Sequence, residues 1–116
     1  MTPNPRAQIT PGGEAVVLIN VYEVAPERQD ELAQLLGEVT EAAIRDRPGF
    51  VSVCIHKSLD GTQVVNYAQW ASKPHFDQML KDPAAQAQFR RLAGVARGVA
   101  PVLYQVAAVH LPGTAG

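Results

Sequence analysis

The feature that most constrains the fold of this chain is a turn signal at Asp60-Gly61, between two strand-forming stretches. Asp-Gly is typical of a tight hairpin, because such a turn needs a positive φ angle that glycine adopts without steric cost. The stretch before the turn, Phe50 to Lys57, is rich in valine and isoleucine, and the stretch after it ends at Trp70. The two stretches therefore predict a pair of antiparallel strands.

The length of the turn decides which residues face each other in this hairpin. With a two-residue turn, the expected pairs are Ile55 with Asn66, Val53 with Ala68 and Val51 with Trp70. A loop that differs by one residue would instead bring His56 to the same face as Asn66. Both registers stay open at this point.

Side chains alternate between the two faces of the strand that follows the turn. One face carries Val64, Asn66, Ala68 and Trp70, and the other carries Val65, Tyr67 and Gln69. The first face is unusual, because it places a carboxamide and an indole N–H among apolar side chains. Buried polar groups need hydrogen-bond partners, which either the protein or a ligand must supply.

The first part of the chain predicts a strand followed by a helix. Residues Ala15 to Val24 are almost all apolar or β-branched, which is typical of a buried strand, and Asn20 interrupts the pattern. Pro26 suits the first turn of a helix, and leucines at helical spacing continue until the helix stops before Pro48.

The last part of the chain predicts two short helices and a final strand. Ser72 and Asp82 are good N-cap residues, and a proline follows each of them within two positions. The last strand is expected over roughly Val102 to His110, with Pro101 suited to a sheet edge. The order of elements predicts an α+β, ferredoxin-like β-α-β-β-α-β fold with an antiparallel sheet.

In that fold the first and third strands are central neighbours, so Asn20 and Asn66 are expected to face the same space. Helices cover one face of the sheet. The other face, which carries Val65 and Tyr67, is left uncovered by this chain, and a second copy meeting it sheet to sheet is the simplest partner. We therefore expect a homodimer.

Composition and charge argue against several classes of partner. The formal net charge is −1 and 18% of the residues are charged, so nothing favours nucleic acid or an anionic membrane surface. No segment is long enough to span a membrane, and the N-terminal residues lack the apolar run of a signal peptide. We expect a soluble, cytoplasmic protein with a flexible N-terminal tail at 1–13, one domain at 14–110 and a short C-terminal tail at 111–116.

Residues that bind metals or nucleotides are too few and too scattered to form a recognisable site. Cys54 is the single cysteine, which excludes an internal disulfide and a cysteine-based zinc site. His56, His75 and His110 stand in separate predicted elements without paired ligand spacing. No glycine-rich phosphate loop follows a strand. The sequence predicts neither a metal site nor a nucleotide cofactor.

The run from Asp60 to Trp70, DGTQVVNYAQW, resembles the antibiotic biosynthesis monooxygenase family, in particular the cofactor-free anthrone oxygenases of aromatic polyketide pathways. The likeness extends from Ala15 to about Val109. It implies a homodimeric α+β barrel with an apolar pocket between sheet and helices, and it places the family's pocket asparagines and tryptophan at Asn20, Asn66 and Trp70.

Two departures from the resemblance concern the helices. Some polyketide oxygenases carry a tyrosine and an arginine where this chain has Phe76 and Phe89, which implies a more apolar pocket. Haem-degrading members carry a histidine and a tryptophan at the positions of Phe89 and Met79, which counts against haem. Phe76, Met79, Phe89 and Ile55 are the residues expected to contact the substrate.

The resemblance implies an oxidation that needs no cofactor, provided the substrate can itself give an electron to O2. A deprotonated anthrone or hydroquinone can do this. We hypothesise that Asn20 and Asn66 hold the phenol and carbonyl oxygens and stabilise the enolate, with the Trp70 N–H as a further donor. His75 is the candidate general base, because histidine exchanges protons near neutral pH. The products would be a quinone and water.

Other interpretations stay open at this stage. Trp70 alone would most simply be a core aromatic residue, and each asparagine could be bonded to a neighbouring strand. At the level of function, the main alternative is a dimer that binds a small molecule without catalysis, and a third is a haem-binding or haem-degrading protein.

Overall fold

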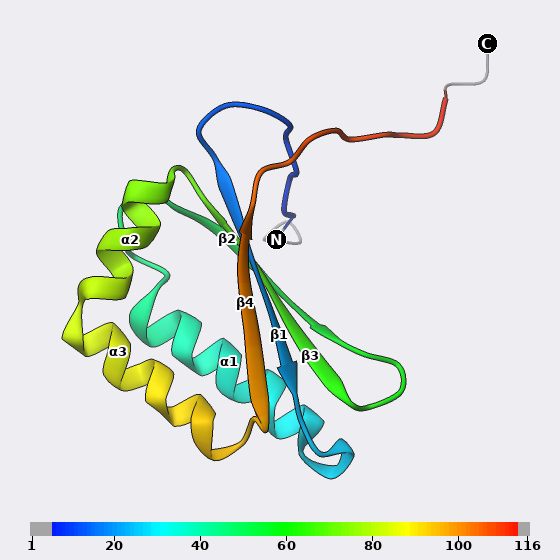
Figure 1. Cartoon of the computed structure of the whole chain (residues 1–116), viewed down its shortest axis with the longest axis vertical. Coiled ribbons are helices and arrows are strands. Elements are labelled where there is room, and N and C mark those ends of the chain that lie inside the picture. The colour runs from blue at the N-terminus through cyan, green and yellow to red at the C-terminus, as the bar shows by residue number, and fades with distance from the viewer. Residues whose placement is uncertain (1–5, 114–116) are drawn as a thin grey trace, which may run out of the picture.

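The computed structural model describes residues 6–113, which form a four-stranded antiparallel sheet with all helices on one face (Figure 1). The elements in chain order are β1 (Val16–Glu23), α1 (Gln29–Ala43), β2 (Phe50–Lys57), β3 (Gln63–Trp70), α2 (Lys73–Lys81), α3 (Pro83–Arg90) and β4 (Gly98–Tyr104). Short 3₁₀ turns at Pro26–Arg28 and Arg91–Gly94 precede α1 and follow α3. The outer ends of the two expected tails, 1–5 and 114–116, lie outside the described residues.

The strand order β2-β3-β1-β4 confirms the predicted ferredoxin-like arrangement, with β1 and β3 as antiparallel central neighbours. Asn20 lies directly opposite Asn66 in this pair. Pro101 lies within β4, which is an edge strand, so its missing N–H removes no bond from the interior of the sheet.

The hairpin between β2 and β3 has the predicted register but not the predicted turn. Gly61 takes a φ of 82° and its N–H bonds the carbonyl of Ser58 at 3.2 Å, while no described residue other than glycine has a positive φ. The loop therefore has four residues, 59–62, closed by Ser58 N–H and the Gln63 carbonyl at 3.0 Å. Four residues leave the same partners opposite each other as two would, so Ile55 still faces Asn66.

Two expectations about the strands are wrong. Phe50, and not Val51, pairs with Trp70, because an irregularity between Phe50 and Ser52 adds one residue to β2. The last strand also begins earlier than Val102. β4 starts at Gly98, where the neighbouring Arg97 N–H bonds the carbonyl of Glu23 at 2.7 Å and joins the chain to the end of β1.

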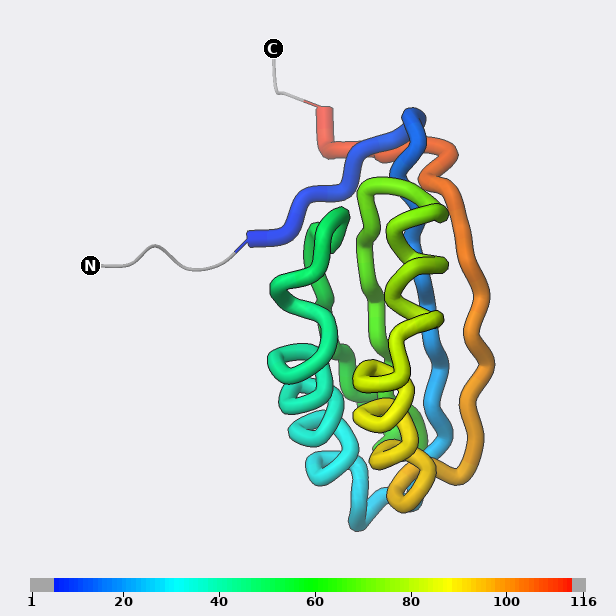
Figure 2. Tube along the Cα trace, turned by 90° about the vertical axis from the view of Figure 1, so that its left-hand side faces the viewer, coloured from blue at the N-terminus to red at the C-terminus, as the bar shows by residue number. Residues whose placement is uncertain are grey.

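Local signals correctly place the two short helices. Ser72 is the N-cap of α2, and Asp82 is the N-cap of α3, accepting a hydrogen bond from the N–H of Ala84 at 2.9 Å. Figure 2 shows α1 side by side with the α2–α3 pair, and both views place all three helices on the same side of the sheet. None of the helices in the described part of the chain has the length and apolarity needed to cross a membrane.

The apolar core between sheet and helices consists of two clusters. One gathers around Trp70, Phe76 and Met79, and the other gathers around Leu32 and Val39 of α1. On the central strands, the pair Asn20 and Asn66 lies between the sheet residues of the two clusters. The core is therefore interrupted at the position of the predicted polar pair.

Candidate active site

A cavity of about 570 Å³ lies between the sheet and the helices. Its walls come from the helix-facing sides of β1 and β3, from all three helices, and from the start of β4. Most of its lining is apolar, and the volume is within the usual range for a site that encloses a small organic ligand.

Asn20 and Asn66 form a polar pair on the floor of this cavity. They are 9% and 6% exposed, and neither amide oxygen has a hydrogen-bond partner among residues 6–113. Folding normally pairs buried polar atoms, because an unpaired one loses its bond to water without replacement. The unpaired amide oxygens therefore favour a role for the two asparagines in binding a ligand over a purely structural role in joining the strands.

Trp70 is both a cavity residue and a core residue. Its side chain is 1% exposed and makes edge-to-face contacts with Phe50 and Phe76, at centroid distances of 5.7 and 6.1 Å. Four residues of strand separate it from Asn66, which is roughly 13 Å along β3. Trp70 therefore lies toward the apolar end of the cavity floor, and its backbone is well separated from the amide pair.

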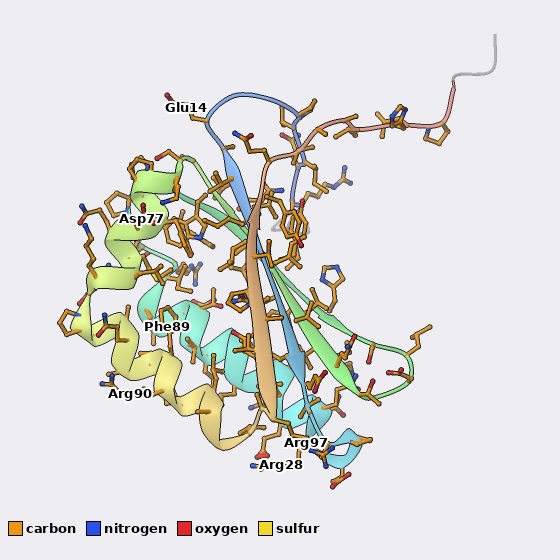
Figure 3. The ribbon with its side chains drawn as sticks, in the orientation of Figure 1. Glu14, Arg28, Asp77, Phe89, Arg90 and Arg97 are labelled. Atoms are coloured by element: carbon orange, nitrogen blue, oxygen red, sulfur yellow. The ribbon has the colours of Figure 1, made fainter. Side chains whose placement is uncertain are left out.

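Three of the expected contact residues lie in the cavity wall. Phe76 and Met79 come from α2 and are buried, and Phe89 comes from α3 and packs against both core clusters. Figure 3 shows Phe89 on the side of α3 that faces α1, while the neighbouring Arg90 points away from it. The spacing of Phe76 and Met79 places both on one side of the helix.

The structure does not bring Ile55 or His75 to the cavity. Ile55 packs against the cluster under α1. His75 is exposed, its Nδ1 lies 2.7 Å from the Ser72 hydroxyl, and its ring rests on Gly49. His75 directly precedes Phe76, so one residue of helical rotation turns it away from the cavity. His75 is therefore not placed to act as a general base in this cavity.

Three further polar residues line the cavity: Tyr22 and Thr40, which the sequence did not single out, and Arg97, which was interpreted mainly as part of a solvated face, with contact to a substrate carboxylate as the lesser alternative. Tyr22 is 7% exposed, and burial raises the pKa of its hydroxyl above the ordinary value of 10.0, an effect that a hydrogen bond from Asn20 partly offsets. Alternation along β1 could have identified it, since Tyr22 follows Asn20 by two positions. Arg97 is the only charged residue among those that line the cavity, and Figure 3 shows it near the start of β4.

The described residues contain no group of three or more His, Cys, Asp and Glu side chains arranged to hold a metal ion. Cys54 is half-buried and pairs with Tyr67, on the sheet face away from the cavity. The chemically useful groups of the site are thus two amides, an indole, a phenol and a guanidinium.

Comparisons with known proteins show which family the chain resembles. A sequence model of the family described as antibiotic biosynthesis monooxygenase matches residues 15–91. Tetracenomycin-F1 monooxygenase of Streptomyces glaucescens is 50% identical over 91 residues, which make up 78% of this chain and 81% of that protein.

Solved structures give the same result for the fold. The ActVA-Orf6 monooxygenase of Streptomyces coelicolor, in complex with nanaomycin D, superposes with a TM-score of 0.75 and is 31% identical, covering 85% of this chain and 93% of its own. SnoaB, a cofactor-independent oxygenase of Streptomyces nogalater, is 23% identical with a TM-score of 0.72, covering 87% of this chain and all of its own.

Proposed function

The chain belongs to the antibiotic biosynthesis monooxygenase family and is a monooxygenase, and from this premise we propose that it oxidises a phenolic, anthrone-like or polycyclic substrate to a quinone without a cofactor. The observation that carries this proposal is the buried pair Asn20 and Asn66, with unpaired amide oxygens on the floor of an apolar cavity. Polar groups of this kind suit an aromatic ligand that carries oxygens on one edge.

The relatives support the chemical type of the substrate. One of them is named for tetracenomycin F1, and the structure of another holds nanaomycin D. We propose a substrate of similar chemical type for this chain, in which a reactive carbon lies beside oxygen-bearing rings.

The reaction needs an electron from the substrate, since O2 reacts slowly with closed-shell organic molecules. In an anthrone, loss of a proton from the central CH2 group gives an enolate that can pass one electron to O2. Recombination forms a C–O bond to a peroxide anion, the peroxide takes up the proton that the CH2 group had lost, and loss of water leaves a carbonyl. One oxygen atom enters the quinone and the other leaves in water, so the substrate supplies all the electrons and no external reductant is consumed.

In this proposal the side chains stabilise charge and exclude water. The amide N–H groups of Asn20 and Asn66 donate to the oxygen on which enolate charge develops, and their unpaired amide oxygens accept from a phenol hydroxyl of the substrate. Fixed donors in a dry site stabilise such charge better than water does, because they need no reorientation during the reaction. Phe76, Met79 and Phe89 hold the rings and keep water out.

We further propose that a second copy of this chain covers the sheet face opposite the helices. On that face Ile19, Val21 and Tyr67 are half-buried and Val102 is 46% exposed. Pairing two such faces would remove these side chains from water. Light scattering on a size-exclusion column should give twice the mass of the chain, and Val102→Lys should shift it toward the single mass. A single mass for the wild-type protein would overturn this proposal.

The test of the activity is O2 consumption with dithranol, a dihydroxyanthrone, after treatment of the protein with a chelator and without flavin. Asn66→Ala should lose roughly a hundredfold or more in rate. Gln34→Ala, which removes an exposed amide on α1, is the control and should behave as wild type. A wild-type protein that binds dithranol without consuming O2 would instead support a binding protein without catalysis.

A further inference from the structure

Tyr22 lies at the polar end of the cavity floor. On the central strands it stands opposite Val64, one alternating position beyond the pair Asn20 and Asn66. In the other direction the floor becomes apolar, through Leu18 and Ala68 to Trp70. The polar side chains of the floor, Tyr22 and the two asparagines, therefore lie toward one end of the cavity, and the indole of Trp70 lies toward the other.

The hydrogen bond of Tyr22 determines what its hydroxyl can still do. Asn20 donates from Nδ2 to the Tyr22 oxygen, at 3.3 Å. The phenol oxygen is thus an acceptor in this contact, and its own O–H remains available as a donor. Among the described residues, none accepts that proton, and the buried hydroxyl stays protonated at neutral pH because burial raises its pKa.

No other hydroxyl proton is free in the cavity lining. Thr40 is the only other hydroxyl residue among the lining residues, and it donates to the carbonyl of Leu36 at 2.8 Å. The helices contribute Phe76 and Phe89 to the wall, which carry no polar group. Tyr22 is therefore the one lining residue with an uncommitted O–H, at a place where a ligand would be enclosed.

We propose that Tyr22 is a further catalytic residue, whose hydroxyl donates a hydrogen bond to a substrate oxygen next to the oxygen held by the asparagine pair. This inference rests on the proposed function and adds a substrate class. Asn20 has a second amide N–H besides the one bonded to Tyr22, so the cavity lining holds two donor atoms 3.3 Å apart, the Asn20 amide nitrogen and the Tyr22 hydroxyl oxygen. Such a pair suits two oxygens that are neighbours on a ring system, as a phenol and an adjacent carbonyl are.

The same geometry predicts the orientation of the substrate. The oxygen-bearing edge lies beside Tyr22 and the asparagines, and the unsubstituted rings extend toward Phe76 and Trp70. A substrate that lacks the second oxygen leaves the Tyr22 hydroxyl without a partner, and so loses affinity and rate.

The kinetic test compares Tyr22→Phe with Tyr104→Phe on two substrates, dithranol and unsubstituted anthrone. Tyr104 pairs with Val17 on the opposite face of the sheet, so its variant removes a hydroxyl of the same kind away from the cavity. Tyr22→Phe should lower kcat/KM for dithranol by about tenfold or more and should affect anthrone less, while Tyr104→Phe should change neither. Equal rates for Tyr22→Phe and wild type on dithranol would overturn the inference.

A binding test keeps the inference separate from the proposed function. Dantron is the dihydroxyanthraquinone that corresponds to dithranol. Its affinity can be measured by calorimetry without any catalytic turnover. Tyr22→Phe should weaken it by about threefold to tenfold. If wild type consumes no O2 but this difference is found, the proposed function and the catalytic role of Tyr22 both fail, and only the hydrogen bond from Tyr22 to a ligand oxygen is supported. If wild type does not bind dantron, or Tyr22→Phe binds it equally well, the inference fails.

The wild-type protein also provides a test, in case Tyr22→Phe does not fold. With an NMR-active carbon at Cζ, the three tyrosines give separate signals, which Tyr67→Phe and Tyr104→Phe assign by elimination. Saturating dantron should shift the Tyr22 signal more than the other two. An unmoved Tyr22 signal at saturation would contradict the inference.

Discussion

Asn20 and Asn66 lie directly opposite each other on β1 and β3, with both side chains on the face that the helices cover. They separate the two apolar clusters of the core, and their amide oxygens have no hydrogen-bond partner in the described part of the chain. Leaving a buried polar atom unpaired costs about 1–3 kcal/mol. The site is therefore built at the expense of stability.

This arrangement predicts opposite effects on stability and on activity. Asn66→Val replaces an unpaired amide by a strand-forming apolar residue, and we expect it to raise the free energy of unfolding by about 1 kcal/mol. The same change should lower anthrone oxidation roughly a hundredfold or more. Urea unfolding and O2 uptake measure the two effects. Asn66→Asp, which adds a buried charge to nearly the same shape, is the control and should destabilise. A less stable Asn66→Val would contradict the prediction.

Much of the fold was predictable because its signals are local. The turn at Asp60-Gly61 and the caps at Ser72 and Asp82 each act within a few residues, and once they are placed the strand order follows. The irregularity after Phe50 was not predictable, since no residue type marks it. The start of β4 at Gly98 depends on pairing with β1, which is a contact distant in sequence.

The lining residues of the candidate site were predictable on the strands, where side chains alternate between two faces. They were less predictable on the helices, where the direction of a side chain depends on the rotation of the helix. Asn20 and Asn66 meet because the side-chain period of a strand is two and the strands are neighbours. His75 was predicted near the cavity but points away from it, because neighbouring residues on a helix differ in direction by about 100°. Tyr22 was not predicted as a site residue because it stands in an apolar run. A tyrosine in such a run is typical of the core, and its hydroxyl alone does not indicate a ligand site.

Asp60 should make the hairpin sensitive to acid. Its carboxylate accepts hydrogen bonds from the Thr62 hydroxyl, the Thr62 N–H and the Ser58 hydroxyl, which lower its pKa from 3.8 to about 2. Because the pKa is lower in the folded state, the stabilisation is present above about pH 4 and is lost as the pH falls toward 2. Urea midpoints of wild type and Asp60→Asn should differ at neutral pH and converge near pH 2.

A second variant identifies the source of this effect. Thr62→Val removes the hydroxyl that contributes most to the lowered pKa of Asp60, so the acid transition should move to higher pH. A constant difference between wild type and Asp60→Asn, from neutral pH down to acid, would show that the carboxylate charge is not responsible.

Arg47 should hold the helices that form the cavity wall. Its guanidinium donates to the carbonyl of Ala43 at 2.6 Å, at the end of α1, and it pairs with Asp82 between α2 and α3. The hydrogen bond from Arg47 to the Asp82 carboxylate is the main reason why the pKa of Asp82 is lowered. Arg47→Ala should lower the Tm by several degrees and speed amide hydrogen exchange in α2 and α3. Arg47→Lys should have a Tm between those of wild type and Arg47→Ala, because lysine keeps the charge but lacks the two-pronged guanidinium donor.

The control for this prediction is a pair on the surface. Arg45→Ala removes an exposed ion pair between Arg45, which follows the end of α1, and Glu41 in the last turn of α1, and pairs of this kind contribute little. We expect its Tm to stay close to that of wild type. If Arg47→Ala and Arg45→Ala behave alike, Arg47 has no special role in holding α2 and α3.

Gly49 should tolerate no side chain, for two separate reasons. It has a φ of 83°, in the left-handed region that costs other residues about 1–2 kcal/mol. A Cβ at this position would also lie 2.2 Å from Cγ of His75. Gly49→Ala should therefore lower the free energy of unfolding by that backbone cost and by about 1–3 kcal/mol of overpacking, as measured by urea unfolding.

The two causes can be separated with a double-mutant cycle. His75→Ala removes the ring that the new Cβ would meet, so Gly49→Ala should cost less in that background and should keep only the backbone part. Gly37→Ala is the matched control, since Gly37 lies within α1 with nothing near its added Cβ, and it should stabilise by about 0.5–1 kcal/mol. If Gly49→Ala costs the same with and without the His75 ring, the close approach of these two residues contributes nothing to the need for glycine at this position.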